Sequence, residues 1–354
     1  MKRSKIFTIA TASVLALGLA ACGGNGDAGS DGADGANGAN GDNGAAGQTS
    51  DGKAMRLSIN QTEEHPSTIA LESFNERLDA ATEGRWSVDV YPNETLGAQQ
   101  ESLQMVSNGS VDMAIVSGTQ LENLNDDFLV FNMPLAFDSV DHQMSVIQDE
   151  AIVGDLFTSL EDSQTLTVLG GFTQGSRHVY NTNGPVQTPE DFAGMKLRVQ
   201  ESDLHLAMAS ALGAEGTPMA YGEVYTGLQS GVLDAAENNE VSYVTVKHFE
   251  VAPYFSNTNH LVGLDYLIIN TDVLNSMNDE DRAAFETEWQ ATMDEHVQMW
   301  TEMTAEAIAD AEAGGAEFND VDAAAFADAL GGLQEQFLTT ESQQALWDAA
   351  RDAA

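Results

Sequence analysis

Positively charged side chains are scarce in this chain, and several of them gather in its middle. The sequence contains 13 Lys and Arg against 56 Asp and Glu, for a formal net charge of −43. Between Arg85 and Lys247 the only cations are Arg177, Lys196 and Arg198. Such an acidic surface disfavours nucleic acid and acidic membranes as partners. An anionic ligand would need locally gathered cations, and this cluster is the first candidate.

Arg198 lies in the segment GMKLRVQ, which alternates as a β-strand does. Successive side chains of a strand point to opposite faces, so Leu197 and Val199 share one face and Arg198 lies on the other. At the carboxyl end of a parallel strand, Arg198 would lie where open α/β sheets bind ligands. A guanidinium there can hold a carboxylate through two parallel hydrogen bonds. The alternative is an exposed sheet edge whose cations pair with nearby acids, and the pattern alone leaves both open.

The chain begins with MKRSKIFTIATASVLALGLAAC, which is typical of a secretory signal. The apolar run is too short for a transmembrane helix. Its last four residues resemble a bacterial lipobox, which implies that residues 1–21 are removed and that Cys22 is lipidated. Cys22 is also the only cysteine, which excludes an intrachain disulfide. We therefore expect the protein to lie on the periplasmic or cell-surface side of the cytoplasmic membrane and to contact the membrane through the lipid anchor only.

Residues 22–53 carry almost no bulky apolar side chain and cannot form a core. Glycine recurs at every third position from Gly26 to Gly47, but the run contains no proline and is too short for a collagen-like triple helix. We expect a flexible linker between Cys22 and a folded body.

From residue 54 onward, short strands alternate with helices. The period-2 patterns predict strands at residues 55–60, 85–91, 111–116, 165–170, 196–200 and 232–236. Cap and stop signals predict helices from Pro66 to about residue 84, and at residues 98–107, 203–212 and 224–230. This alternation indicates two α/β domains with parallel sheets covered by helices on both faces.

One helix near the carboxyl terminus is predicted to be unusually long. Phe285, Trp289, Met293, Val297 and Trp300 recur at steps of three or four along an amphipathic pattern that ends at Gly314. About 35 residues at about 1.5 Å each give a helix of roughly 50 Å, more than one small domain needs. We expect it to bridge the two domains.

Six segments carry a resemblance to a known family. They are YPNETLGAQQESLQMVSNGSVDMAIV, DDFLVFNMPLAFDSVDH, GFTQGSRHVYN, TPEDFAGMKLRVQES, LGAEGTPMAYGEVYTGLQSGVLDAAENN and KHFEVAPYFSNTNH. Together they resemble the solute-binding proteins of tripartite ATP-independent periplasmic (TRAP) transporters, of the DctP type. The resemblance implies a periplasmic-binding-protein-like α/β fold, with a cleft between two lobes and a long C-terminal helix spanning both. Lobe I is then expected at residues 54–175 and 263–300, and lobe II at residues 176–262 and 301–354.

The resemblance also implies roles for individual residues. Arg198 matches the main carboxylate anchor, Arg177 a second cation near the cleft, and Asn238 an amide donor to the same carboxylate. Tyr221 matches an aromatic residue beneath the ligand, with core packing as its alternative. The remaining ligand contacts are expected from His65, whose alternative is a plain helix cap, and from Asn60, Ser117, Gln174, Gln200 and Asn239.

One departure from the family pattern bears on the substrate. Proline usually follows Glu237-Asn238, whereas Asn239 follows here. This form is similar to members that bind sugar acids such as glucuronate or galacturonate. A hexuronate offers one carboxylate and many hydroxyls, which can be satisfied by the side chains of Asn238, Asn239, Gln174, Gln200 and Glu201. A C4-dicarboxylate or another carboxylic acid is the alternative ligand.

The resemblance implies capture of the acid by lobe closure and its delivery to membrane subunits of a transporter. A secreted glycoside hydrolase is the rival class, although surplus acids make any carboxylate pair uninformative. A sensory role, in which a receptor reads the closed form, is a third. From residue 54 onward the sequence contains no G-x-S-x-G, H-E-x-x-H or G-x-G-x-x-G motif, and its histidines lack metal-ligand spacing. We therefore expect no catalysis, no cofactor and no metal.

Overall fold

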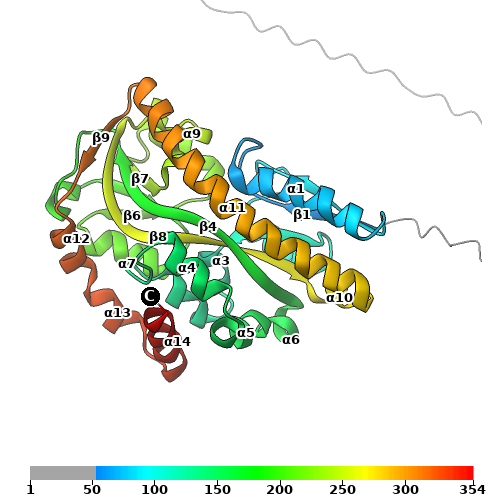
Figure 1. Cartoon of the computed structure of the whole chain (residues 1–354). Helices are drawn as coiled ribbons and strands as arrows, with labels where there is room; N and C mark the ends of the chain where they lie inside the picture. Colours follow the sequence, from blue (N-terminus) through cyan, green and yellow to red (C-terminus); the bar gives the residue numbers. More distant parts are fainter. Residues whose placement is uncertain (1–52, 354) are drawn as a thin grey trace, which may run out of the picture. The chain divides into compact units, whose positions relative to one another are not determined.

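The structure is a computed structural model that describes residues 53–353 (Figure 1). The predicted signal peptide, the lipidation site Cys22 and nearly all of the predicted linker lie outside the described residues. Within residues 53–353, none of the helices combines the length and the hydropathy that crossing a bilayer requires.

The described residues contain one mixed sheet of nine strands. Its order is β2-β1-β3-β8-β4-β7-β5-β6, and β9 pairs with β8. The strands are β1 (Lys53–Ser58), β2 (Trp86–Tyr91), β3 (Met113–Ser117), β4 (Leu166–Asn181), β5 (Lys196–Val199), β6 (Glu215–Pro218), β7 (Ala235–Asn238), β8 (Tyr254–Asn270) and β9 (Glu317–Asp320).

Strands β4 and β8 run through the whole sheet and join two smaller parallel groups. β1 is parallel to β2 and β3, and β5 is parallel to β6 and β7. β8 is antiparallel to β3, and β4 is antiparallel to β7 and β8. The expectation of parallel sheets is therefore correct for each group and wrong for the strands that join them. We call the β2-β1-β3 side the first lobe and the β7-β5-β6 side the second lobe.

The prediction for β4 stopped too early because of a glycine pair. Gly170 adopts φ +91, and the register of β4 against β8 shifts between Val168 and Gly171. This irregularity bends the strand without ending it. A long joining strand therefore reads in the sequence as a short strand followed by a turn.

Helices cover the sheet. They are α1 (Pro66–Ala81), α2 (Gln99–Ser107), α3 (Gly118–Glu122), α4 (Val140–Ile147), α5 (Glu150–Thr158), α6 (Glu161–Gln164), α7 (Asp203–Ala211), α8 (Val224–Ser230), α9 (Glu240–Thr245), α10 (Thr271–Asn275), α11 (Asp279–Ala313), α12 (Ala323–Leu330), α13 (Gly332–Phe337) and α14 (Glu341–Asp352). The 3₁₀ turns are η1 (Asp126–Asn132), η2 (Pro189–Phe192), η3 (Tyr221–Glu223) and η4 (His248–Glu250). The predicted bounds of α8 are confirmed, and Ser202 caps α7 as expected by accepting a hydrogen bond from the backbone N of His205.

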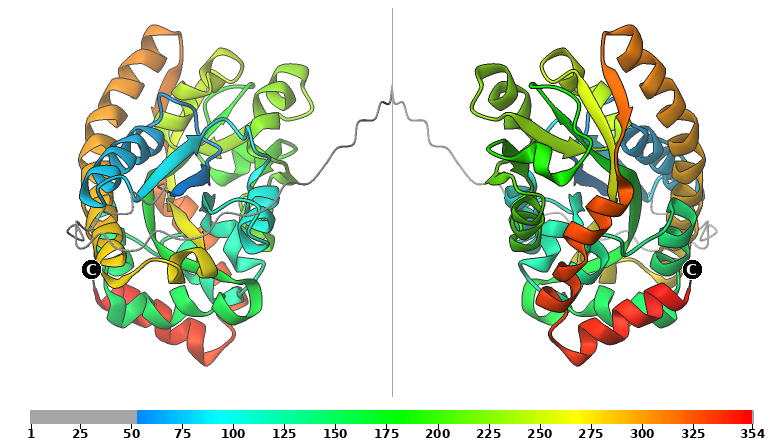
Figure 2. Two further views of the ribbon diagram at one scale, coloured as in Figure 1. Left: turned by 90° about the vertical axis from the view of Figure 1, so that its right-hand side faces the viewer. Right: turned by 90° about the vertical axis from the view of Figure 1, so that its left-hand side faces the viewer.

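Helix α11 is the long helix that the apolar pattern predicts, and it has 35 residues. Asn278 caps its amino terminus by accepting a hydrogen bond from Asp281 N. Its first half packs on α1, where the Phe74 ring lies 5.2 Å from the Phe285 ring and 5.6 Å from the Trp289 ring. Further along it contacts β4 and then α9 of the second lobe. Figure 1 shows it running diagonally in front of the sheet, and Figure 2 shows it along one side of the molecule.

The last helix, α14, packs on the segment that contains η1, α4 and α5. His142 Nε2 lies 2.7 Å from the carbonyl oxygen of Ala350, and Arg351 forms an ion pair with Asp138 at 2.8 Å. The prediction that assigns all of residues 301–354 to the second lobe does not anticipate these contacts.

Candidate functional site

A cavity lies between the two lobes, and its empty volume of about 540 Å³ includes space that is open to solvent. The ends of strands β1, β3, β5 and β7 supply part of its lining, and the middle of β4 and β8 supplies another part. The carboxyl ends of strands in an open α/β sheet are where ligands are expected to bind. Most predicted binding residues line this cavity, namely Asn60, Ser117, Gln174, Arg177, Arg198, Gln200, Tyr221 and Asn238.

His65 and Asn239 lie behind the cavity lining. His65 is the fully buried cap of α1, where its Nδ1 accepts a hydrogen bond from Ser67 N and its Nε2 lies 3.3 Å from Ser242 Oγ. Asn239 caps α9 and accepts a hydrogen bond from Ser242 N at 2.7 Å. Both side chains therefore use their polar atoms within the protein.

Arg198 is buried beside the cavity without an acidic partner. Its Nε and Nη2 donate to the carbonyl oxygen of Met219 at 2.9 and 2.7 Å. Only 5% of its surface is exposed, and no carboxylate in residues 53–353 forms an ion pair with it. Burial lowers the pKa of its guanidinium. These facts exclude the exposed-edge alternative and leave Nη1 available to an anion in the cavity.

Arg177 is buried against Glu237, which neutralises it. Its Nε and Nη2 donate to the two Glu237 carboxylate oxygens at 2.5 and 2.7 Å, and Nη2 also donates to the Glu237 carbonyl oxygen. Burial alone raises the pKa of the Glu237 carboxyl, but Arg177 outweighs this effect and holds that pKa below its usual range. Arg177 therefore offers a ligand little net charge.

Asn238 joins Arg177 to the cavity. Its Oδ1 accepts hydrogen bonds from Arg177 Nη1 at 2.9 Å and from the backbone N and Nδ2 of Asn239 at 3.0 and 3.1 Å. Because these donors occupy the oxygen, the amide is oriented with its Nδ2 free to donate. The arrangement suits the donor role that the family resemblance implies.

Several buried polar atoms in the cavity wall have no hydrogen-bond partner within the described part of the chain. They are Asn60 Oδ1, Gln61 Oε1, Glu94 Oε1, Gln174 Oε1 and Tyr221 Oη. Four of them are carbonyl or carboxylate oxygens. An amide carbonyl oxygen can accept hydrogen bonds but cannot donate them, and the same holds for a carboxylate oxygen when the acid is ionised. An unsatisfied buried polar group costs about 1–3 kcal/mol. This wall therefore fits a ligand that supplies several donors.

Sequence reasoning missed two acids in the wall, Glu94 and Asp265. Burial raises the pKa of Asp265 to about 7, against the opposing effect of Arg177. Burial likewise raises the pKa of Glu94, although Arg198 acts in the opposite direction. A signal for Asp265 was present, because it is the only acid in the otherwise apolar run LVGLDYLII. Glu94 lies in YPNETLG, where nothing distinguishes it from the many surface acids.

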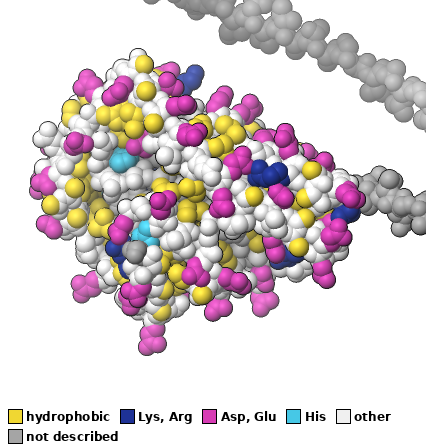
Figure 3. All heavy atoms as spheres, in the orientation of Figure 1, with side chains coloured by type: hydrophobic (Ala, Val, Ile, Leu, Met, Phe, Trp, Pro, Cys, Tyr) yellow, Lys and Arg dark blue, Asp and Glu magenta, His cyan; other side chains and the backbone are white. Residues whose placement is uncertain are grey.

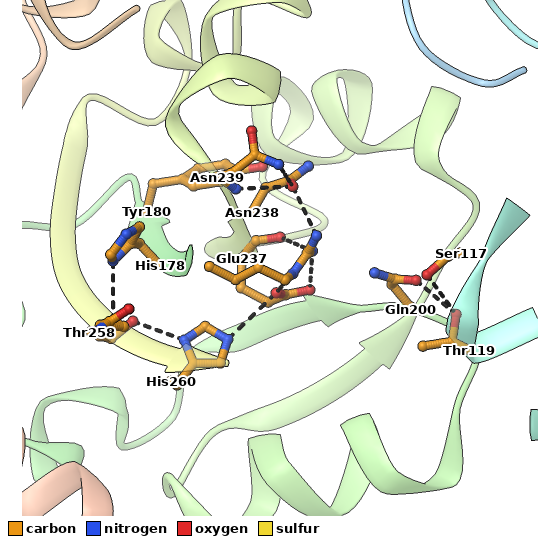
Figure 4. A network of polar contacts seen from close by, with 12 residues as sticks. Ser117, Thr119, His178, Tyr180, Gln200, Glu237, Asn238, Asn239, Thr258 and His260 are labelled. Atoms are coloured by element: carbon orange, nitrogen blue, oxygen red, sulfur yellow. Dashed lines mark hydrogen bonds and ion pairs between the residues drawn. The ribbon is translucent and has the colours of Figure 1, made fainter. Parts of the chain in front are cut away.

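Two hydrogen bonds close the cavity on one side by joining the lobes. Thr119 Oγ1 donates to Gln200 Oε1 at 2.7 Å, which Figure 4 shows, and Asn123 Nδ2 donates to the Glu201 carbonyl oxygen at 3.2 Å. The donors lie in or beside α3, and the acceptors follow β5. Among the described residues, no group of three or more His, Cys, Asp or Glu side chains is arranged to hold a metal ion.

Comparison with known proteins agrees with this architecture. The family model DctP, described as bacterial extracellular solute-binding protein, family 7, matches residues 57–340. A solute-binding protein of Chromohalobacter salexigens is 34% identical over 278 residues, which cover 77% of this chain and 81% of that protein.

Two solved structures of TRAP periplasmic solute-binding proteins are similar to this chain. The Anaerococcus prevotii protein, with bound α/β-D-glucuronate, is 32% identical, has a TM-score of 0.82, and the match covers 85% of this chain and 97% of that one. The Xanthobacter autotrophicus protein, with bound β-D-galacturonate, is 30% identical with a TM-score of 0.80, and the match covers 85% and 100%.

Proposed function

The chain belongs to the bacterial extracellular solute-binding proteins of family 7, and we propose that it is the hexuronate-binding subunit of a TRAP transporter. Its similarity to proteins with bound glucuronate and galacturonate supports this assignment. The cavity also supports it, because one cation without an acidic partner and several hydrogen-bond acceptors without donors line the same space.

The cation side suits a single carboxylate. Arg198 has no acidic partner and Asn238 has a free amide donor, whereas Glu237 already neutralises Arg177. One ligand carboxylate can therefore accept from Arg198 and Asn238, with Arg177 contributing at most its remaining Nη1 hydrogen. The main charge of the site is then satisfied by one acid group.

The rest of the wall favours a hexuronate over a C4-dicarboxylate. Sugar hydroxyls can donate to the unpartnered oxygens of Gln61, Glu94 and Gln174, whereas an ionised dicarboxylate has no donor to give. A second ligand carboxylate would also approach the acids Glu94 and Asp265 in a buried, poorly screened space. We therefore expect sugar acids to bind and C4-dicarboxylates to bind weakly.

Binding is expected to proceed by lobe closure. The ligand bridges Arg198 on the second lobe to polar groups such as Asn60 and Ser117 on the first, which shifts an open population toward the closed form. The hydrogen bonds from Thr119 and Asn123 to the segment after β5 stabilise the closed form further. Membrane subunits of the transporter then take up the ligand from this form. Lipidation at Cys22 would hold the protein on the outer side of the cytoplasmic membrane.

Calorimetric titration of the mature protein tests the ligand assignment. D-Glucuronate or D-galacturonate should bind with micromolar affinity, about −8 kcal/mol, and succinate should bind at least about tenfold more weakly. Tighter binding of succinate would contradict the hexuronate assignment. NMR of the incubated sugar acid and of a uronide glycoside distinguishes the enzyme alternative, because a binding protein leaves both spectra unchanged.

A further inference from the structure

A buried hydrogen-bond chain supports one side chain of the cavity from behind. Gln174 on β4 lines the cavity, and its Nε2 donates to Ser67 Oγ at 3.3 Å. Ser67 Oγ in turn lies 3.1 Å from Nε2 of His296 on α11. Ser67 and His296 are fully buried and do not line the cavity. Three separate elements, β4, α1 and α11, thus meet in one polar chain.

Ser67 and His296 are held in place by their surroundings. The backbone N of Ser67 donates to His65 Nδ1 at 3.2 Å in the first turn of α1. The His296 ring stacks on Phe172, with ring centres 4.2 Å apart and planes 16° from parallel, and it lies 5.6 Å from Trp300. Neither side chain can turn away without losing these contacts. The chain therefore acts as a rigid support for Gln174.

The single hydrogen of the Ser67 hydroxyl determines which way the Gln174 amide is oriented. The Ser67 hydroxyl has one hydrogen, and when it donates to His296 Nε2 it can only accept from Gln174. Gln174 must then turn its NH₂ toward Ser67 and leave Oε1 for the cavity. That oxygen is buried and has no partner in the described residues. If His296 Nε2 carried the hydrogen instead, Ser67 could donate to Gln174, and the amide could flip to present a donor.

We infer that Ser67 and His296 are positioning residues that fix Gln174 with its Oε1 as an acceptor for one ligand hydroxyl. This inference rests on the proposed function, because it assumes a hydroxylated acid as ligand. It makes specificity depend on two residues that never touch the ligand. Loss of either should allow the Gln174 amide to rotate and should weaken selection for the hydroxyl.

A double-mutant cycle measured by calorimetry tests the inference in the full mature protein. The variants are Ser67→Ala, Gln174→Ala and their combination, titrated with whichever hexuronate binds wild type better. A hydrogen bond contributes a net factor of roughly 2 to 13, so each single variant should weaken binding by about five- to tenfold. Because Ser67 acts through Gln174, the double variant should bind no worse than Gln174→Ala alone. Additive losses, or wild-type affinity in Ser67→Ala, would overturn the inference.

Two further variants keep the test decisive. His296→Phe retains stacking on Phe172 and should also weaken binding in wild type but not in a Gln174→Ala background, so it replaces Ser67→Ala if that variant fails to fold. Ser256→Ala is the matched control, because Ser256 is equally buried, bonds to Val186 N and Asn319, and lies away from the cavity. It should leave affinity unchanged. Absence of hexuronate binding by wild type would refute the proposed function, whereas additive losses in a protein that binds would refute only the inference.

Discussion

At the scale of single residues, two buried arginines near one cavity have different environments, so replacing one should mainly affect binding and replacing the other should mainly affect stability. Arg198 has no acidic partner, so its charge is available to a ligand carboxylate. Truncating one partner of a buried charge pair costs roughly 2–5 kcal/mol of binding free energy. Arg198→Ala should therefore weaken hexuronate binding at least about 30-fold in a calorimetric titration. Unchanged affinity would remove Arg198 from its role as the anchor.

Arg177 should matter more for stability. Replacing it with methionine leaves the Glu237 carboxylate buried without its counter-ion, since Glu237 is fully buried. Breaking such a pair typically costs about 3–5 kcal/mol. Urea unfolding of Arg177→Met should show this loss, whereas Arg198→Ala should lose less stability, because it removes the donors to the Met219 carbonyl oxygen but leaves no buried charge without its counter-ion. Equal midpoints for the two variants would mean that the pairing with Glu237 does not separate their roles.

Residue types and spacing were informative where one cation stands out among many acids. Arg198 and Arg177 could be singled out because cations are rare, and the family resemblance located Asn238 and Tyr221. Glu94 could not be singled out in the same way, because acids are everywhere. The roles of His65 and Asn239 could not be separated, because helix caps and ligand contacts use the same residue types and both occur near strand ends. Only three-dimensional contacts separate these roles.

At the scale of elements, helix α3 carries a buried acid whose contribution to stability depends on pH. Glu122 is buried and accepts a hydrogen bond from Asn132 Nδ2 at 2.8 Å. Burial raises the pKa of Glu122 to about 7. Ser202 and Asn132 act in the opposite direction, and Asp203 and Asp126 add to the rise. Because the folded-state pKa exceeds the usual value of 4.5, the stability it contributes is present below about pH 4.5 and is lost as the pH rises through about 7.

Glu122→Gln should therefore reduce the loss of stability between pH 5 and pH 8. Asp265 has a similarly raised pKa and should retain part of the slope. Urea unfolding at both pH values measures the difference between the variant and wild type. A Glu122→Gln protein that keeps the full wild-type slope would show that Glu122 is solvated in the folded state.

Elements with strong periodic patterns were predictable, and irregular ones were not. The apolar spacing in α11 reports one buried face over its whole length, so its extent was recoverable. β7 was predicted three residues too early, because Val232 looks like a strand residue but is half exposed in the turn before the strand. The continuation of β4 past Gly170 depends on its pairing with β8, which is a contact between distant segments.

At the scale of the whole molecule, acidic side chains spread over the surface while the binding groups are enclosed. Figure 3 shows Asp and Glu side chains over most of the visible face and few Lys or Arg. Salt screens charges that face solvent, with a Debye length near 3 Å at 1 M, and affects enclosed pairs much less. The surface charge and the binding site should therefore respond differently to salt.

Raising NaCl from 0.1 to 2 M should increase the thermal unfolding midpoint, because repulsion among surface acids is screened. The dissociation constant for hexuronate should change less than about threefold, because Arg198 is buried in the lobe interface. Differential scanning calorimetry and titration at both salt concentrations measure the two effects. A large fall in affinity at high salt would indicate that long-range attraction, rather than contact, holds the acid.

A crystal structure of the mature protein grown with D-glucuronate would show directly which side chains bind the acid. We expect the ligand carboxylate to accept hydrogen bonds from Arg198 Nη1 and Asn238 Nδ2, and the ligand hydroxyls to donate to Gln61, Glu94 and Gln174. A complex in which Arg198 contacts only Met219 and solvent, while the carboxylate is bound elsewhere, would contradict this prediction.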